Sequence, residues 1–164
     1  MQYPRAFSHI GLSVPNLEQA VEFYSQVMGW YVVMEPSVIH EETTSAIGIM
    51  CQEVFDKGHG DFKIAHIVTS NSIGIELFEF ADNNQQKQPF QFKNTGMFHF
   101  SVQDPDIETL VANIVKHGGK QRMPIKSYYP DEKPYKMCYV EDPFGIVFEI
   151  YTHSYEVTYS KGAY

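Results

Sequence analysis

The sequence predicts an α+β fold that consists of two copies of one module, each a strand, a helix and three further strands. Two observations support this prediction. The chain contains an internal repeat, in which Ser8-His9-Ile10 corresponds to Phe98-His99-Phe100 and Ile75-Glu76-Leu77 corresponds to Phe148-Glu149-Ile150. Each half also places a segment with helical apolar spacing directly after its first alternating segment, which is typical of an amphipathic helix that follows a strand. Together they indicate a duplicated structural unit.

The first half begins with an alternating segment at residues 7–14, which predicts a strand. Asn16 then offers an N-cap, and apolar residues recur at helical spacing as far as residue 28. Gly29 is typical of the residue that follows a helix, so the helix is expected over residues 17–28. Three strands are expected to follow, at residues 30–35, 46–53 and 63–80, with a break in the last at residues 70–72.

The second half repeats this order. A strand is expected at residues 97–103, and Asp104-Pro105 is expected to cap the next helix, with the proline at its first position. Apolar residues keep helical spacing over residues 107–115, and Gly118-Gly119 ends the helix. Strands are then expected at residues 120–125, 136–141 and 145–152, with a turn at residues 142–145.

The two halves are expected to form one domain over residues 1–164. It would contain a module at 5–80, a linker at 81–95 and a module at 96–153. The linker is rich in Asn, Gln and Lys, a composition typical of a connection and not of a packed element. Two further polar segments are expected to be loops, at residues 55–61 and 126–134.

The composition predicts a cytoplasmic protein without a nucleic-acid or membrane partner. The chain has 12 Lys and Arg against 20 Asp and Glu, a net charge of −8, which disfavours binding to a phosphate backbone. No apolar run reaches the roughly 20 residues that a membrane span needs, and the first residues lack the apolar region of a signal peptide. Cys51 and Cys138 show no metal-binding or redox spacing, so free thiols are expected.

Four residues of the repeat have side chains that bind metal ions, namely His9, Glu76, His99 and Glu149. Strands of two equivalent modules can bring such imidazole and carboxylate groups toward a shared concavity, where they suit a divalent cation. Strand alternation places Glu76 and Glu79 on opposite faces, and the repeat selects Glu76. Each of the four alone is better explained as a core or surface residue, but their coincidence favours a joint metal site.

Other residues are given ordinary roles. The remaining histidines have no counterpart in the repeat and are expected to be core or surface residues: His40, His59, His66, His117 and His153. Three basic residues near the second half are expected to be solvated surface charges: Arg122, Lys133 and Lys136. Aromatic residues at strand spacing are candidates to line an apolar pocket, although such residues are more often plain core: Phe78, Phe80, Tyr135 and Tyr151.

The chain resembles the vicinal oxygen chelate superfamily, which contains glyoxalase I, methylmalonyl-CoA epimerase and extradiol dioxygenases. The resemblance extends from Phe7 to Tyr151. Its motifs are His9 with Val14-Pro15-Asn16-Leu17, Phe23-Tyr24, Met28-Gly29-Trp30, Ile75-Glu76-Leu77, His99 with Val102, and Glu141-Asp142-Pro143-Phe144-Gly145 followed by Glu149. The resemblance implies a glyoxalase-like fold, in which paired βαβββ modules form a curled mixed sheet around a metal site.

Within this superfamily, the set of two histidines and two glutamates is most similar to that of glyoxalase I. This implies that His9, Glu76, His99 and Glu149 bind one divalent ion (Zn, Ni, Co, Mn or Fe). It also implies a lyase or isomerase that transfers a proton next to a carbonyl of a small α-oxo or enolisable substrate. Glu149 would be the main base, and Glu76 a ligand and second proton carrier. Relatives build the site within one chain or across a dimer, and a homodimer is expected.

Two positions differ from glyoxalase I. That enzyme has an arginine four residues after the first ligand and an asparagine four residues after the second, and both bind glutathione. This chain has Ser13 and Phe80 there. Because an anionic tripeptide needs such fixed donors, the expected substrate is not a glutathione adduct.

Two other functions stay open. A ring-cleaving dioxygenase holds Fe(II) with two histidines and one carboxylate; a fourth ligand at Glu76 argues against it, although Asp142-Pro143-Phe144-Gly145 followed by Glu149 is compatible with it. A non-catalytic protein that binds a drug-like molecule in the same concavity would not need four metal ligands. The fold alone does not decide between these functions.

Overall fold

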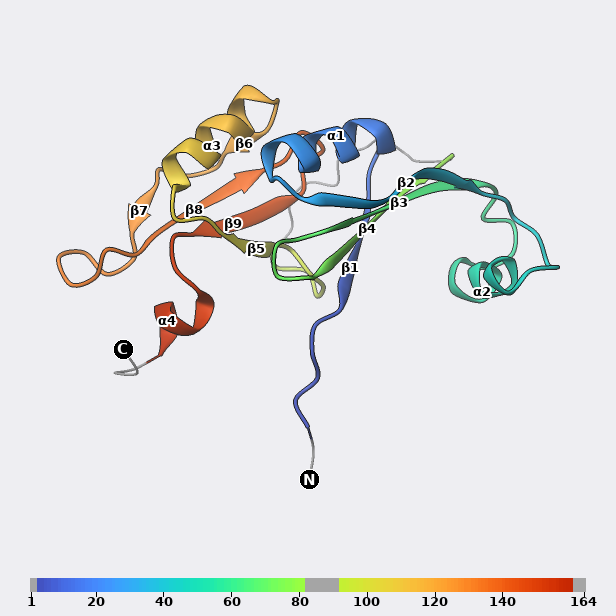
Figure 1. Ribbon diagram of the computed structural model, residues 1–164, viewed down its shortest axis with the longest axis horizontal. Coiled ribbons are helices and arrows are strands. Elements are labelled where there is room, and N and C mark those ends of the chain that lie inside the picture. The colour runs from blue at the N-terminus through green and yellow to red at the C-terminus, as the bar shows by residue number, and fades with distance from the viewer. Residues whose placement is uncertain (1–2, 82–91, 161–164) are drawn as a thin grey trace. The chain divides into compact units, whose positions relative to one another are not determined.

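The computed structural model describes residues 3–81 and 92–160, and the chain divides into two compact units, residues 1–85 and 86–164 (Figure 1). Each unit corresponds to one half of the predicted repeat and combines helices with a mixed sheet. The predicted α+β class and the two βαβββ-like modules are therefore confirmed. That both modules form a single domain stays a prediction, and most of the predicted linker 81–95 lies outside the described residues.

The first unit is a four-stranded mixed sheet with a helix packed on it. Its elements are β1 (His9–Ser13), α1 (Leu17–Val27), β2 (Tyr31–Ile39), α2 (Ala46–Phe55), β3 (Phe62–Val68) and β4 (Gly74–Phe80). The strand order is β1-β4-β3-β2, with β1 parallel to β4 and the other neighbours antiparallel. Helix α1 contacts β2, β3 and β4 (Figure 1).

The second unit repeats this arrangement. Its elements are β5 (Phe100–Gln103), α3 (Ile107–Lys116), β6 (Lys120–Gln121), β7 (Lys126–Ser127), β8 (Lys136–Glu141), β9 (Val147–Tyr151) and α4 (Tyr155–Tyr159). The strand order is β5-β9-β8-β6, and β7 also pairs with β8. As in the first unit, the first strand runs parallel to the last, and α3 contacts the sheet at β6 and β8.

The two sheets place the glutamates of the repeat at the same register. Gly11 lies opposite Glu76 in the first unit, and Ser101 lies opposite Glu149 in the second. In both units the histidine of the repeat lies two residues before that opposite residue. Side chains two residues apart on a strand point the same way, so the local geometry for a His–Glu pair is duplicated.

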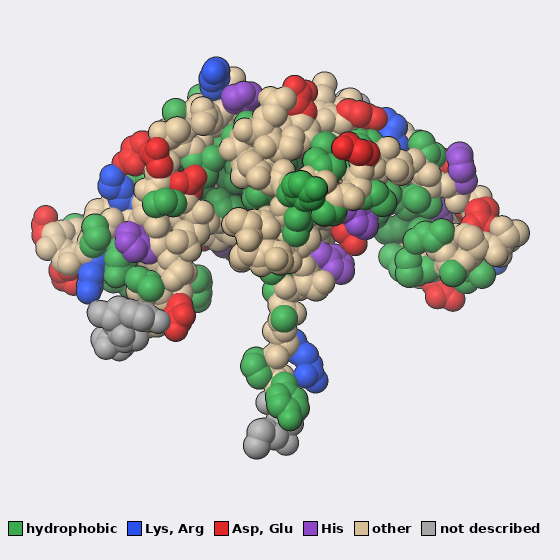
Figure 2. All heavy atoms as spheres, viewed as in Figure 1, with side chains coloured by type: hydrophobic (Ala, Val, Ile, Leu, Met, Phe, Trp, Pro, Cys, Tyr) green, Lys and Arg blue, Asp and Glu red, His purple; other side chains and the backbone are tan. Residues whose placement is uncertain are grey.

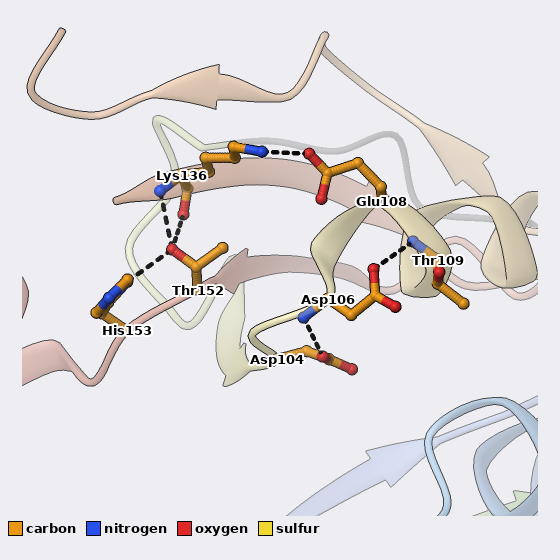
Figure 3. A network of polar contacts seen from close by, with 7 residues as sticks. All are labelled: Asp104, Asp106, Glu108, Thr109, Lys136, Thr152 and His153. Atoms are coloured by element: carbon orange, nitrogen blue, oxygen red, sulfur yellow. Dashed lines mark hydrogen bonds and ion pairs between the residues drawn. The ribbon is translucent and has the colours of Figure 1, made fainter. Parts of the chain in front are cut away.

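An ion pair between helix and sheet is duplicated as well. Lys63 on β3 pairs with Glu18, the second residue of α1, with 2.9 Å between Nζ and Oε1. Lys136 on β8 pairs with Glu108, the second residue of α3 (Figure 3). Exposed pairs of this kind contribute little stability, but they identify which face of each sheet carries the helix.

The cap of the first helix agrees with the prediction, and that of the equivalent helix does not. Asn16 caps α1, since its side chain accepts the N–H of Gln19 at 2.8 Å. The predicted cap at Asp104-Pro105 is wrong, because Asp106 caps α3 by accepting the N–H of Thr109 at 3.3 Å (Figure 3). The proline therefore precedes the cap, in a turn where the Asp104 side chain accepts the Asp106 N–H.

The predicted strand at residues 46–53 is wrong, because this segment is the helix α2. Ser45 caps it by accepting the N–H of Gly48 at 3.1 Å, and the Glu42 carboxylate accepts the N–H groups of Thr44 and Ser45. These bonds satisfy donors that a helix start leaves free. Gly48 packs so closely on Glu42 that a Cβ atom on residue 48 would collide with the Glu42 carboxylate.

Other differences concern the ends of strands. β2 continues past the expected end at residue 35 to Ile39, and as an edge strand it accommodates Pro36. Of the expected strand at 120–125, only β6 forms, since Pro124 has no N–H to donate. Cys51 and Cys138 are buried free thiols, as predicted. None of the described helices is both long and apolar enough to cross a membrane.

The stability of the unit that carries α2 should depend on pH through Glu42. Hydrogen bonds from the side chains of Ser45 and Thr44 lower the pKa of this carboxyl from 4.5 to about 2. A carboxyl with a lowered pKa stabilises the folded state while it is ionised. Its contribution is therefore complete above about pH 4.5 and is lost as the pH falls toward about 2.

Glu42→Gln should accordingly lower the Tm measured by circular dichroism at neutral pH. The difference from the wild type should shrink as the pH falls from about 4.5 to about 2. Glu53→Gln, at an exposed position of α2, should show no such trend. A Tm difference that does not change with pH would contradict the assignment.

Candidate functional site

In the first unit, Glu76 lies on the face of the sheet opposite α1. Glu79 marks the helix face, because its Oε2 accepts the N–H of Leu17 at 2.7 Å, and strand alternation then turns Glu76 the other way, as predicted. The Nε2 atom of His9 lies 3.8 Å from Oε2 of Glu76, with side chains 53% and 29% exposed. The Nδ1 atom of His9 lies 3.2 Å from the Ser8 hydroxyl, so Nε2 is the nitrogen that faces the carboxylate.

In the second unit, Glu149 lies on the face opposite α3. Lys136 reaches the helix, and Tyr139, three residues further along β8, points the other way and pairs with Glu149 across the strands. The Nε2 atom of His99 lies 3.2 Å from Oε2 of Glu149, and this pair is more buried, with side chains 25% and 11% exposed. The Nδ1 atom of His99 is buried and has no hydrogen-bond partner among the described residues.

A side chain on the neighbouring antiparallel strand lies directly opposite each glutamate. His66 on β3 lies opposite Glu76, and Tyr139 on β8 lies opposite Glu149, so each shares the face of its glutamate. Burial, followed by hydrogen bonding to Glu149 and its charge, raises the pKa of Tyr139 well above its ordinary value. The phenol is therefore a neutral donor beside the carboxylate. Neither residue was expected at the site from the sequence.

Further tyrosines surround Glu149. The hydroxyl of Tyr151, two residues along β9, lies 2.7 Å from that of Tyr159 in α4. The ring of Tyr128 packs on both, with centroid distances of 6.0 and 5.5 Å. Burial is the main cause that raises the pKa of Tyr159 to about 12, and the charge of Glu149 adds to it. These hydroxyls stay protonated at neutral pH, and the C-terminal helix, for which the sequence gives no role, supplies one of them.

The corresponding surface of the first unit is apolar. Phe78 and Phe80 follow Glu76 on the same face of β4, and Phe62 on β3 packs on them with centroid distances of 6.0 and 5.2 Å. Phe55, at the end of α2, packs on all three with distances of 5.3–6.0 Å. We call these four residues the phenylalanine cluster. Two of the residues predicted to line a pocket, Phe78 and Phe80, belong to it.

The donors of each unit suit a divalent cation. Two donors that bind one ion at 2.0–2.2 Å with tetrahedral or octahedral angles lie roughly 2.8–3.6 Å apart. The 3.2 Å between His99 and Glu149 falls in this range, and the 3.8 Å between His9 and Glu76 is slightly wider. Over residues 3–81 and 92–160, no three His, Cys, Asp or Glu side chains are grouped closely enough to hold an ion. Each unit thus presents a pair of donors.

Two of the three basic residues noted in the sequence are engaged elsewhere. Arg122 pairs with Glu141, and Lys136 pairs with Glu108 on the helix face of its sheet. Both pairs lie at partly exposed positions, which agrees with their interpretation as surface charges. In the second unit the hydroxyl donor beside Glu149 is therefore that of Tyr139, and these two cations pair with other carboxylates.

Comparisons with known proteins identify the family. The profile of the Glyoxalase/Bleomycin resistance protein/Dioxygenase superfamily matches residues 6–150, whereas no curated protein matches the chain. Among solved structures, a glyoxalase family protein from Bacillus cereus is 20% identical, with a TM-score of 0.73 over 92% of this chain and 95% of that one.

Two more distant structures share the fold. A variant of the fosfomycin resistance protein FosX from Listeria monocytogenes, complexed with Mn(II) and 1S,2S-dihydroxypropylphosphonic acid, is 14% identical, with a TM-score of 0.58 over 96% of this chain and all of that one. A glyoxalase I variant from Zea mays is 16% identical, with a TM-score of 0.58 over 90% of this chain and 45% of that one. At these identities the structures show the glyoxalase-like fold alone. Because the family profile spans most of the sequence, the chain belongs to the Glyoxalase/Bleomycin resistance protein/Dioxygenase superfamily, as its resemblance to the vicinal oxygen chelate proteins implied.

Proposed function

We propose that the chain is a metal-dependent lyase or isomerase of the glyoxalase type, which transfers a proton next to a carbonyl of a small substrate. The observation that carries the proposal is the duplicated His–Glu pair, which has the same register in both sheets and faces away from the helix in both. Each pair also has a side chain that can exchange or donate a proton directly opposite its glutamate. Membership of the superfamily agrees with this chemistry.

The ligands that we propose are His9, Glu76, His99 and Glu149, which together bind one divalent ion. One pair supplies two donors, whereas a divalent ion in a catalytic site usually takes three or four from the protein. The two pairs together satisfy that requirement, and a FosX structure with the same fold contains Mn(II). When bound, such an ion supplies a Lewis acid that stabilises negative charge on the carbonyl oxygen of the substrate.

The two glutamates divide the proton transfer. Glu149 is the main base, because its side chain is the more buried of the two, so water competes less for its oxygen atoms. Tyr139 holds this carboxylate in place as a neutral donor. Glu76, whose side chain is 29% exposed, is the second proton carrier, and His66 opposite it can exchange protons with it.

Tyr139→Phe should slow proton transfer about tenfold, because it removes the donor that orients the Glu149 carboxylate. Because Tyr139 donates to a proposed ligand, the substitution should also weaken metal binding, by about 10- to 100-fold, and the rates are therefore compared with every variant saturated with metal. The rate is measured as exchange of a carbon-bound proton with D2O by NMR, at saturating metal. Tyr155→Phe, at an exposed position of α4, is the matched control. An unchanged rate for Tyr139→Phe would remove this positioning role.

The substrate that we propose is an α-oxo or enolisable compound other than a glutathione adduct. Ser13 and Phe80 occupy the positions at which glyoxalase I has its glutathione-binding residues, and Phe80 is packed within the phenylalanine cluster, where it offers no polar donor. The test is the exchange of the C3 protons of pyruvate and phenylpyruvate with D2O, beside turnover of the methylglyoxal–glutathione adduct. Faster turnover of the adduct than exchange of either acid would contradict the proposal.

The same preparation distinguishes the alternatives. Oxygen consumption with catechol by the Fe(II)-loaded protein would favour a ring-cleaving dioxygenase. Tight binding of small molecules without proton exchange would favour a binding protein.

The proposal also includes a homodimer. Light scattering of the purified chain measures its molar mass in solution and tests this directly.

A further inference from the structure

The phenylalanine cluster supports an inference about the substrate. We propose that this cluster is a subsite for an aromatic ring of the substrate, and that the imidazole of His59 occupies it when the substrate is absent. The inference rests on the proposed function to the extent that the ring belongs to the α-oxo compound on which the chain acts.

The polar ring of His59 packs against apolar rings. It lies in the loop between α2 and β3, and its ring makes edge contacts with Phe55 and Phe62 at centroid distances of 5.9 and 5.8 Å. Both ring nitrogens are buried, and neither has a hydrogen-bond partner in the described part of the chain. Buried polar atoms without partners are costly. A ring without nitrogen could make the same edge contacts without this cost.

The cluster adjoins the first donor pair. Phe78 lies two residues after Glu76 on the same face of β4, and Gly11 lies opposite Glu76 on β1. The Phe78 ring lies over Gly11 so closely that a Cβ there would be 3.3 Å from Cε2 of Phe78. A substrate whose carbonyl is near Glu76 would therefore have an aromatic surface beside it.

The fold of the module does not require apolar residues at the positions of the phenylalanine cluster. The repeat relates Phe62, Phe78 and Phe80 to polar aromatic residues of the second unit, namely Tyr135, Tyr151 and His153. There the Tyr151 hydroxyl has a partner in Tyr159, whereas no side chain of the phenylalanine cluster carries a polar atom. The same fold thus tolerates polar rings at these positions, and their absence from the first unit suits an apolar ligand.

The segment that carries His59 makes few buried contacts. Within α2, only Gly48 and Cys51 are buried, and Figure 2 shows apolar side chains gathered at the surface over this helix. The loop itself is fixed by the Glu41 carboxylate, which accepts the N–H groups of Gly58 and Gly60, on either side of His59, at 2.7 and 2.8 Å. Segments with few buried contacts open at small cost. A ligand can therefore displace the imidazole while the two hydrogen bonds to Glu41 keep the ends of the loop in place.

The test compares phenylpyruvate, which has a ring, with pyruvate, which does not, by calorimetric titration of the metal-loaded protein. His59→Ala empties the subsite and should tighten phenylpyruvate binding about fivefold, because the ligand no longer competes with the imidazole. His59→Phe fills it with a ring that has no unpartnered nitrogen, and should weaken phenylpyruvate binding about fivefold. Phe80→Ala should weaken it about tenfold. Pyruvate binding should change less than about twofold in all three.

If His59 had only a structural role, His59→Ala and His59→Phe would not change the affinity for phenylpyruvate in opposite directions. The matched control is His40→Ala, which removes an exposed histidine that pairs with Asp61, and it should leave both affinities unchanged. Equal binding of the two acids by the wild type, or parallel changes for both acids, would overturn the subsite. If the chain binds phenylpyruvate more tightly than pyruvate but exchanges no proton, the subsite is supported and the proposed function is rejected. If it exchanges protons but binds both acids equally well, the proposed function is supported and the subsite is rejected.

Discussion

Glu149→Gln should reduce the exchange of a substrate's carbon-bound proton with solvent by about 10²–10⁴-fold, the contribution expected of a general base. The amide is nearly isosteric with the carboxylate but cannot accept the proton. The measurement is the initial rate of deuterium incorporation into pyruvate or phenylpyruvate by NMR. It must be made at saturating metal, because Glu149 is also a proposed ligand and the substitution weakens metal binding.

Two controls make this result specific. Glu132→Gln changes an exposed carboxylate of the same unit and should leave the rate unchanged. Glu76→Gln should slow exchange less than Glu149→Gln, since we propose its carboxylate only as the second proton carrier. Equal rates for Glu149→Gln and the wild type at saturating metal would exclude Glu149 as the base. If Glu76→Gln lowered the rate more than Glu149→Gln, Glu76 would be the main base and Glu149 the second proton carrier.

His9→Ala and His99→Ala should each weaken binding of Mn(II), Ni(II) and Zn(II) at least about 100-fold. The loss of a partner outside the ligand shell already costs 10- to about 100-fold in affinity, and the loss of a ligand should cost no less. The affinities are measured by competition with a chromophoric chelator. Both substitutions should have effects of similar size, although the two histidines belong to different units, because we propose that both bind the same ion.

Two further histidines provide controls. His117→Ala removes an exposed imidazole at the end of α3, where Nδ1 interacts with the carbonyl of Asn113, and it should not change the affinity. His66→Ala should weaken binding less than His9→Ala does, if His66 acts on Glu76 only from outside the ligand shell. A loss for His66→Ala equal to that for His9→Ala would add His66 to the ligands, and normal binding by both His9→Ala and His99→Ala would reject the site.

The repeat made much of the fold predictable from the sequence. Asn16 and Gly29 delimit the first helix within about one residue because capping is a local interaction. The alternation around Glu76 separates this residue from Glu79 in the structure as it does in the sequence. These features depend on neighbours in the chain, and the repeat supplied an independent check on them.

The segment at residues 46–53 shows where such reasoning fails. Ile47, Ile49 and Cys51 alternate as in a strand, but Ile47, Met50 and Val54 also fit one face of a helix. Short apolar segments leave the two periods unresolved. The decisive contacts come from Ser45 and from Glu42, whose carboxylate caps the start of the helix. An N-cap serine directly before the apolar segment was the available signal.

The candidate site was predictable only in part, and for a similar reason. His9, Glu76, His99 and Glu149 were found because the repeat marks them. His66 and Tyr139 are equivalent to each other in position but not in residue type, so no sequence match connects them. Their relation appears only through the pairing of β3 with β4 and of β8 with β9. Both precede their glutamate by the same number of residues, a spacing that has meaning only once the strand register is known.

The metal content of the purified chain tests the central claim most directly. Elemental analysis after loading with Mn(II) and removal of excess ion should give one ion per chain, because the proposal assigns the four donors of the two pairs to one site. The double variant His9→Ala/His99→Ala should give none. Two ions per chain, with one lost in each single variant, would show that each pair binds its own ion. No bound ion in the wild type would contradict a metal-dependent function altogether.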